Sequence, residues 1–280
     1  MEREVYSIGY GPGAHRWHSQ RTARDRAGFF LPFLRPGMRL LDCGCGPGSI
    51  TLGFAEVLAS GSVVGVDLEP RQIERARALA AQRGAANVEF RVGDIYELAF
   101  PDASFDAAFA HNVLEHLSDP LRALREMRRV LRPGGVVAIR DPDYGTVLCV
   151  PSTPLLAEAS SLVLRVRERN GGSPYYARHQ RRLLLEAGFG RSIGFAFAEC
   201  QGDTGAVRAF ADILVEVLCS PATVDVAVGE GWADRETLDA MAAGVRAWSE
   251  EPGAFRAVMD CAAVGWVDGP AGERTRPAKS

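Results

Sequence analysis

The sequence has almost no lysine, no long apolar run and no surplus of positive charge. Lys279 is its single lysine, and the formal net charge is −3. Proteins that bind a nucleic-acid backbone usually carry a basic surplus, so neither DNA nor RNA is expected as a partner. No segment approaches the roughly 20 apolar residues that span a bilayer, and the first ten residues, MEREVYSIGY, lack the apolar core of a secretory signal. We therefore expect a cytoplasmic protein with no stable membrane insertion.

The cysteines form no metal-binding pattern. They are spread along the chain, without a CxxC pair or a cluster of histidine and cysteine. Zinc and iron–sulfur sites need closely spaced ligands, so no metal is expected. Inert thiols in a reducing compartment explain these residues more simply. The cysteines are Cys43, Cys45, Cys149, Cys200, Cys219 and Cys261.

From residue 38 onwards, short apolar segments alternate with segments of helical spacing. The apolar segments, such as SVVGVD at 62–67, are β-branched, and a helical segment such as 70–84 begins with proline and ends at glycine. This alternation predicts an α/β protein with a mostly parallel sheet and helices on both faces. A further helix is expected from Gln20 to Leu34, because the residue before Pro36 is disfavoured in a helix.

The stretch from Arg39 to Thr51, RLLDCGCGPGSIT, predicts a strand, a glycine turn and the start of a helix. Gly44, Gly46 and Gly48 allow positive φ and close approach of a ligand, and the helix start behind them offers free amides. The spacing DxGxGxG differs from the dinucleotide fingerprint GxGxxG, because its third glycine comes one position early. Asp42 would repel a pyrophosphate, so the stretch favours a cationic or amino-bearing ligand. A plain tight turn stays open as the alternative.

Two more aspartates end predicted strands at the same edge of the sheet. Asp67 follows the glycine loop by about 20 residues, where an acidic side chain accepts hydrogen bonds from a ribose diol. Its alternative role is to cap the helix that begins at Pro70. Asp94 follows the third strand and is a candidate acceptor for an adenine amino group, with Ile95 packed on the base. A turn residue is the alternative for Asp94.

Five segments, in their order and spacing, resemble the class I S-adenosylmethionine-dependent methyltransferases, and most closely the ubiquinone/menaquinone-biosynthesis-type small-molecule branch. The segments are LLDCGCGPGSIT, GVDLEP, NVEFRVGDIYELAFPDASFD, AHNVLEHLSDPLRALREMRRVLRPGG and AIRDPDY. The similarity extends from HSQRTA to LLLEAGF, roughly residues 10–200. It implies a Rossmann-like, seven-stranded, mostly parallel sheet with an antiparallel last strand, and S-adenosyl-L-methionine as the cofactor.

The resemblance also implies which residues hold the cofactor. Residues beside its methionine part would be Asp42, Gly44, Cys45, Gly46, His111 and Asn112. Residues for its ribose and adenine would be Asp67, Leu68, Asp94 and Ile95.

Catalytic residues are harder to name, because methyl transfer from a sulfonium needs alignment and exclusion of water, and only sometimes removal of a proton. His111 ends the fourth strand and is a candidate general base, with a structural histidine as the alternative. His18, in the N-terminal segment, is a second candidate, or a solvent histidine. Asp143 follows the fifth strand, where substrate contacts are common. Asp141 and Asp143 together could bind a divalent metal, but no third ligand is placed beside them.

The resemblance divides the chain into expected parts. Residues 1–37 would form an N-terminal lid or helical segment, and residues 38–267 the methyltransferase domain. A helical insertion at about 204–250, before the last strand, is a candidate substrate lid or the surface of a homodimer. The tail at 268–280 is polar and rich in proline and glycine, which predicts disorder.

The expected acceptor is a small metabolite. No PPY-type tetrapeptide follows the fourth strand, where enzymes that methylate amino groups of nucleic acids often carry one. We therefore expect direct methyl displacement onto a quinol-, phenol- or polyketide-like molecule. Two alternatives stay open: a fold relative with non-methylating chemistry such as cyclisation, and a non-catalytic binding protein.

Overall fold

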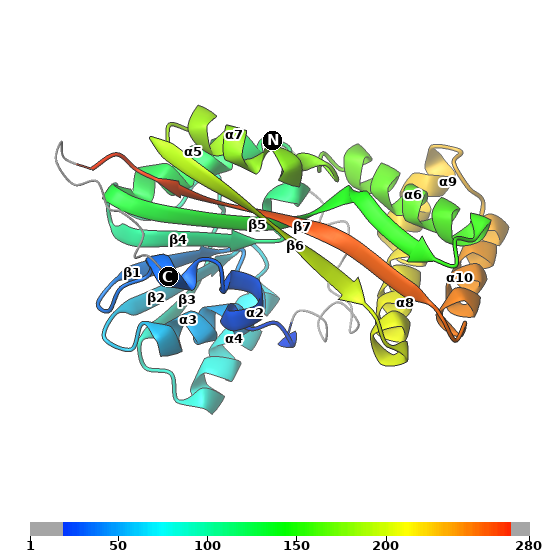
Figure 1. Cartoon of the computed structure of the whole chain (residues 1–280), viewed down its shortest axis with the longest axis horizontal. Helices are drawn as coiled ribbons and strands as arrows, with labels where there is room; N and C mark the ends of the chain where they lie inside the picture. The colour runs from blue at the N-terminus through cyan, green and yellow to red at the C-terminus, as the bar shows by residue number, and fades with distance from the viewer. Residues whose placement is uncertain (1–18, 270–280) are drawn as a thin grey trace.

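The computed structural model describes residues 19–269 of the chain. It consists of a seven-stranded sheet flanked by helices and a separate cluster of helices at one end (Figure 1). His18, residues 1–18 of the expected lid at 1–37, and the tail from residue 270 lie outside the described residues.

The sheet has the strand order β3-β2-β1-β4-β5-β7-β6. The first five strands run parallel, and β7 is antiparallel to both of its neighbours, β5 and β6. This confirms the predicted Rossmann-like sheet with an antiparallel last strand. The strands are β1 (Arg39–Cys43), β2 (Ser62–Asp67), β3 (Val88–Val92), β4 (Phe105–His111), β5 (Leu131–Val150), β6 (Arg191–Gln201) and β7 (Phe255–Trp266).

Helices cover both faces of the sheet, as predicted, because alternate strand residues are apolar on both sides. Leu40 of β1 and Phe109 of β4 pack in one cluster with α2 and α3, whereas Leu41 and Ala110 pack in a second cluster with α5 and α7. The flanking helices are α2 (Ala23–Ala27), α3 (Ser49–Val57), α4 (Pro70–Arg83), α5 (Pro120–Val130) and α7 (Gln180–Glu186).

The helix predicted from Gln20 to Leu34 is wrong in its length. The structure has the short α2, which begins with a capping box between Thr22 and Asp25, and a separate 3₁₀ turn at Leu31–Phe33. Gly28 follows α2 as its C-cap, and Pro32 lacks the amide that would continue an α-helix. The chain turns between them, and the turn places Phe30 in the core, where it is fully buried.

Strand β5 is much longer than the sequence predicts. Asp141 and Asp143 were expected after the fifth strand, but both lie inside β5, which remains paired with β7 up to Val150. The pairing is irregular between Asp143 and Leu148. Because β4 ends at His111, opposite Arg140, the rest of β5 extends beyond the carboxyl edge of the parallel strands. Together with β6 and β7 it forms an arm, which we define as residues 141–150, 195–201 and 255–260.

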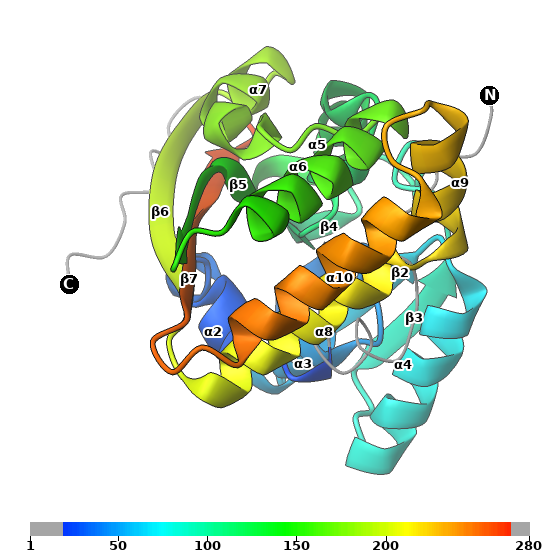
Figure 2. The same cartoon turned by 90° about the vertical axis from the view of Figure 1, so that its right-hand side faces the viewer.

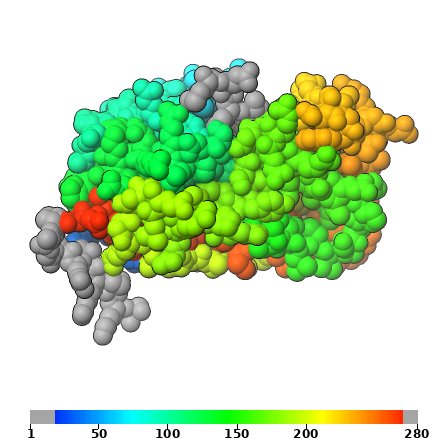
Figure 3. Space-filling view, turned by 90° about the horizontal axis from the view of Figure 1, so that it is seen from above, coloured from blue at the N-terminus to red at the C-terminus, as the bar shows by residue number. Residues whose placement is uncertain are grey.

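The arm carries a helical lobe at its end, which we define as α6 (Pro154–Arg169), α8 (Thr204–Leu218), α9 (Pro221–Gly229) and α10 (Arg235–Ser249). Figure 2 shows α6, α10 and α8 side by side, and Figure 3 shows the lobe as a mass at one end of the molecule. Its own apolar core includes Leu162, Leu214 and Trp248. The predicted insertion at 204–250 contains only three of these helices; α6 comes from an earlier part of the chain. No helix within residues 19–269 is long and apolar enough to cross a bilayer.

Candidate functional site

The site lies where the parallel strands end. In the register of the sheet, Asp42 of β1 is opposite Gly65 of β2 and Phe109 of β4. Asp67 and His111 end the strands on either side of β1. The carboxyl ends of neighbouring parallel strands share one edge, so residues from 42 to 112 of the sequence meet there.

The three glycines after β1 fall into two kinds. A side chain at Gly44 would collide with Val113, and one at Gly48, whose φ is 82°, would lie 2.8 Å from the ring of Phe90. Gly46, with φ of 52°, has no described atom within 4 Å of where its Cβ would lie. Gly44 and Gly48 are therefore required by packing, and Gly46 is the one that faces open space. A ligand can approach the backbone closely only at Gly46.

Asp67 organises the glycine loop from the neighbouring strand. Its carboxylate accepts hydrogen bonds from the amide of Gly46 (2.8 Å) and the amide of Glu69 (2.9 Å). Burial raises the pKa of Asp67, although these backbone amides oppose the effect. Each carboxylate oxygen has a second acceptor position, so the same group can still accept a hydrogen bond from a ligand hydroxyl. The alternative role of Asp67 as the cap of α4 is wrong, because the N-cap is Glu69, whose carboxylate accepts from the amide of Arg71 (3.2 Å).

Asp42 is almost fully buried, with 3% of its surface exposed. The hydroxyl of Thr51 donates to it at 2.6 Å. Burial raises the pKa of Asp42 to about 7, the hydrogen bond from Thr51 lowers it, and the nearby charge of Asp67 adds to the rise. A nearby cation, such as the ammonium group of an amino acid, would stabilise the ionised form of this buried carboxyl group.

The residues predicted for the adenine are more exposed. Leu68, directly after β2, has 40% of its surface exposed, which is unusual for a leucine beside a core strand. Asp94 is exposed and accepts a hydrogen bond from the amide of Tyr96 (2.8 Å), as a turn residue does. Ile95 is half-buried against the main core. Cys45 is buried between the loop and Phe90, so its thiol faces away from solvent.

His111 and Asn112 lie on the opposite side of β1 from Asp67. His111 is buried and its ring is parallel to that of Phe109, with centroids 6.4 Å apart. Asn112 has a positive φ of 55°, and its amide donates to the carbonyl of Arg140 (3.0 Å). Its Oδ1 is buried and has no hydrogen-bond partner among residues 19–269. A buried acceptor of this kind needs a donor, which a ligand at this edge can supply.

Asp143, the third catalytic candidate, is engaged by another side chain. Arg178 donates to both of its oxygens, at 2.7 and 2.6 Å. A carboxylate held by a guanidinium in this way is a poor acceptor for a substrate proton. In the described part of the chain, no three His, Cys, Asp or Glu side chains are grouped closely enough to hold a metal.

A buried ion pair beside the site escaped sequence reasoning. Glu115 is fully buried in the 3₁₀ turn after β4 and is paired with Arg167 of α6, while Nε2 of His116 lies 3.4 Å from Glu115 Oε1. Burial opposes ionisation of Glu115, but the charges of Arg167 and His116 outweigh it and lower its pKa. The only sequence signal was the charged residue within the apolar segment VLEHL. This pair joins the carboxyl edge of the sheet to the helical lobe.

A second buried group of polar side chains surrounds Asp141. Its carboxylate accepts from the amide of Val113 (3.0 Å) and from Nε2 of Gln180 (2.9 Å). Burial, followed by the charge of Glu115, raises the pKa of Asp141 well above its usual value. Asp141 therefore fixes the chain directly after Asn112, rather than binding a metal with Asp143.

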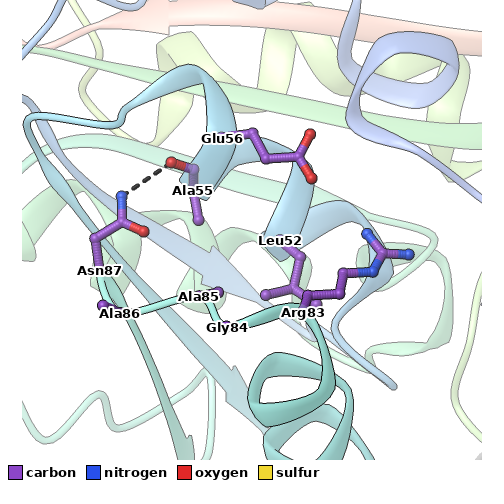
Figure 4. A pocket seen from close by; sticks show the side chains of 8 residues that line it. All are labelled: Leu52, Ala55, Glu56, Arg83, Gly84, Ala85, Ala86 and Asn87. Atoms are coloured by element: carbon purple, nitrogen blue, oxygen red, sulfur yellow. Dashed lines mark hydrogen bonds between the residues drawn. The ribbon is translucent and has the colours of Figure 1, made fainter.

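A small pocket of about 230 Å³ lies at the other end of the sheet (Figure 4). It is bounded by the later part of α3 and the turn from α4 to β3, and Nδ2 of Asn87 donates to the carbonyl of Ala55 on its wall (2.9 Å). This is the amino end of β3, opposite the edge that holds Asp42 and Asp67. The pocket is therefore separate from the candidate site.

The region that contains the site is similar to a known family of proteins. A family described as methyltransferase domain matches residues 34–170. Together with the strand order, this match makes the fold that of a class I methyltransferase. Residues 34–170 therefore match a methyltransferase domain and have the fold of the class I methyltransferases, as the sequence motifs predicted.

Curated relatives are similar over about half of this chain. A probable methyltransferase, ltbC, of Aspergillus luteorubrus is 39% identical over 49% of this chain and 51% of its own. The 27-O-demethylrifamycin SV methyltransferase of Amycolatopsis mediterranei is 40% identical over 53% of this chain and 51% of its own. The chain therefore spans about half the length of these relatives. Among solved structures, the YcgJ protein from Bacillus subtilis has a TM-score of 0.59 at 20% identity, covering 89% of this chain and 100% of its own.

The residues at the edge fit the cofactor that this family implies. Open space at Gly46, the buried carboxyl of Asp42 and the unsatisfied Oδ1 of Asn112 all lie at the carboxyl edge formed by β1 and β4. The exposed Leu68 and the carboxylate of Asp67 lie beside them. These carboxylate and amide oxygens accept hydrogen bonds, which suits an amino acid joined to a nucleoside. None of these residues carries the positive charge that would favour a pyrophosphate.

Proposed function

We propose that this protein transfers a methyl group from S-adenosyl-L-methionine to a small-molecule acceptor. The observation that carries the proposal is that the carboxyl of Asp42, the open space at Gly46 and the unsatisfied Oδ1 of Asn112 lie at the same carboxyl edge of the sheet. When bound, the cofactor supplies an electrophilic methyl group on a sulfonium. The protein's part is to hold that group in line with the acceptor and to exclude water.

Separate residues serve these tasks in the proposal. Asp42 and Oδ1 of Asn112 hold the amino-acid part, and Asp67 holds the ribose. Asp141 positions the segment that carries Asn112 through its hydrogen bond from Val113. His111 is proposed as the group that takes a proton from the acceptor, because it is the one imidazole that ends a strand at this edge within the described chain.

The acceptor is proposed to be quinol-, phenol- or polyketide-like. The negative net charge disfavours nucleic acids as substrates. One relative is named as a methyltransferase of 27-O-demethylrifamycin SV. The helical lobe stands beyond the edge that would carry the methyl group, so we propose that it covers the acceptor. This role for the lobe rests on its position at the end of the arm.

The decisive experiment is incubation with S-adenosylmethionine labelled in its methyl group and a panel of quinols, phenols and polyketides. Label in one acceptor, together with formation of S-adenosylhomocysteine, supports the proposal and identifies the acceptor class. Conversion of an acceptor without uptake of label would favour cyclisation instead. Binding of S-adenosylhomocysteine without any conversion would favour a non-catalytic binding protein, and absence of binding would reject the cofactor site itself.

A further inference from the structure

Arg256, near the start of β7, is a buried guanidinium without an acidic partner. It has 7% of its surface exposed, and no carboxylate of residues 19–269 lies within 4.0 Å of its nitrogens. Its Nη1 donates to Oε1 of Gln201 at 2.9 Å, and its buried Nε has no partner among the described residues. An ionised group removed from water without a counter-charge is costly, so this arrangement calls for an explanation.

Two other buried arginines, one in β5 just before the arm and one in the lobe, show how this protein pairs a structural guanidinium. Arg140, 4% exposed, is paired with Asp260 at 2.9 Å and donates to the carbonyl of Asp25 in α2. Arg167, 2% exposed, is paired with Glu115. Both are neutralised by a carboxylate of the chain itself, whereas Arg256 is not.

The surroundings of Arg256 form a partly aromatic, positively charged region under the lobe. Its guanidinium lies 4.2 Å from the ring centroid of Phe210 in α8, and this cation–π contact offsets part of the cost of burial. Burial still lowers the pKa of Arg256. On the other side is Tyr144, whose ring lies 4.5 Å from the guanidinium of Arg167. The charges of both arginines lower the pKa of Tyr144, although burial raises it overall.

The position of this region connects it to the candidate site. In the sheet register Arg256 is opposite Cys149 of β5 and Gln201 of β6, on the part of the arm that lies beyond the edge holding His111. Arg167 is joined to Glu115, three residues after Asn112. Glu115 is paired with Arg167, whereas Arg256 has no carboxylate of the described chain within 4.0 Å. The more distant carboxylates that act on Arg256, Asp260 and Glu199, are themselves paired with Arg140 and Arg26.

We propose that the acceptor of this enzyme is a monoanion whose carboxylate pairs with Arg256. This inference rests on the proposed function and names the class of its substrate. A guanidinium with free donors matches the two oxygens of a carboxylate, and the Phe210 ring beside it suits an acceptor with an apolar or aromatic body. The carboxylate would lie under the lobe, and the methyl-accepting atom would extend from it towards the carboxyl edge.

The test compares two probes of nearly the same size and shape, 4-hydroxybenzoate and 4-hydroxybenzamide, in the presence of saturating S-adenosylhomocysteine; the neutral amide of the second replaces the carboxylate of the first. The acid should raise the melting temperature of the full chain more than the amide does, because a ligand of the folded state stabilises it. Arg256→Met should weaken binding of the acid about tenfold or more, the effect of losing a charge-assisted hydrogen bond, and should leave binding of the amide unchanged. Arg256→Lys should keep part of the preference for the acid.

The stability of the unliganded variants separates a binding role from a structural one. Arg256→Met should melt at the same temperature as the wild type or higher, because an unpaired buried charge is replaced by an apolar chain. Arg140→Met, the matched control, should melt at a lower temperature, because it leaves Asp260 unpaired. Equal responses to acid and amide, or an Arg256→Met protein as unstable as Arg140→Met, would overturn the inference. Either result would leave the binding of S-adenosylhomocysteine intact, and with it the proposed function. If instead S-adenosylhomocysteine does not raise the melting temperature of the wild-type protein, the proposed function itself is rejected.

Discussion

The cofactor edge and the helical lobe differ in how the chain specifies them. At the edge, Asp42, Gly46 and Asp67 each have a backbone conformation or a hydrogen bond that few other residues could replace. In the lobe, Leu162, Leu214 and Trp248 need only be apolar and of suitable size to fill one core. The first region is therefore recognisable from a motif, and the second only from helical periodicity. If the proposed function is right, cofactor binding at the edge and the shape of the proposed acceptor site at the lobe should be alterable independently.

The largest expected effect comes from removing the centre of the lobe. Trp248, 1% exposed, packs against Phe210 at 6.2 Å between ring centroids and donates from Nε1 to the carbonyl of Val150 (3.2 Å). Trp248→Ala should lower the free energy of unfolding by about 3–5 kcal/mol in urea titration. Binding of S-adenosylhomocysteine to the remaining folded protein should not change, as measured by calorimetry. Trp248→Phe serves as the control, and a parallel loss of cofactor affinity would show that the two regions are not separable.

The next effect concerns turnover at the edge. This test uses an acceptor identified by the labelling experiment. If the imidazole is the general base, His111→Asn should lower kcat about a hundredfold. The affinity for S-adenosylhomocysteine should stay the same. The acid limb of the pH–rate profile should disappear in the variant. Wild-type turnover would make His111 a packing residue that stacks on Phe109.

A smaller effect is expected on cofactor affinity. Asp67→Ala should weaken binding of S-adenosylhomocysteine about tenfold, because the ribose and the Gly46 amide both lose an ionised acceptor. Glu89→Ala removes an exposed carboxylate from the neighbouring β3 and is the matched control. Equal affinities of the two variants in calorimetry would remove Asp67 from the binding site.

The smallest effect is a pH dependence set by Asp42. Since the pKa of Asp42 is raised to about 7, the unliganded folded protein keeps this proton while the unfolded chain loses it near 3.8. The contribution of Asp42 to stability therefore falls as pH rises between these two values. An ammonium ligand binds the ionised carboxylate, so affinity for S-adenosylhomocysteine should rise severalfold as pH increases through about 7. Asp42→Asn should bind more weakly and lose this dependence; an unchanged pH profile would contradict the role of Asp42.

Much of the cofactor edge was predictable because its residues act through local geometry. The alternation of strands and helices predicts the parallel sheet, and the glycine spacing places the loop between β1 and α3. Which glycine faces the ligand was not predictable: Gly44 and Gly48 are fixed by Val113 and Phe90, residues far from them in the sequence. The end of β5 was also missed, since its length depends on pairing with β7, more than a hundred residues later.

The class of fold, the strand RLLDC and the glycine loop after it could be predicted from the residues alone, because strand periodicity and glycine conformation are local properties. Tertiary contacts were needed to show that α6 joins α8–α10 in one lobe, that Asp143 is held by Arg178, and that Glu115 neutralises Arg167. They were also needed to show that Arg256 is left without a counter-charge among the described residues. Pairing and burial depend on which distant segments meet, and a linear pattern of residue types does not record that.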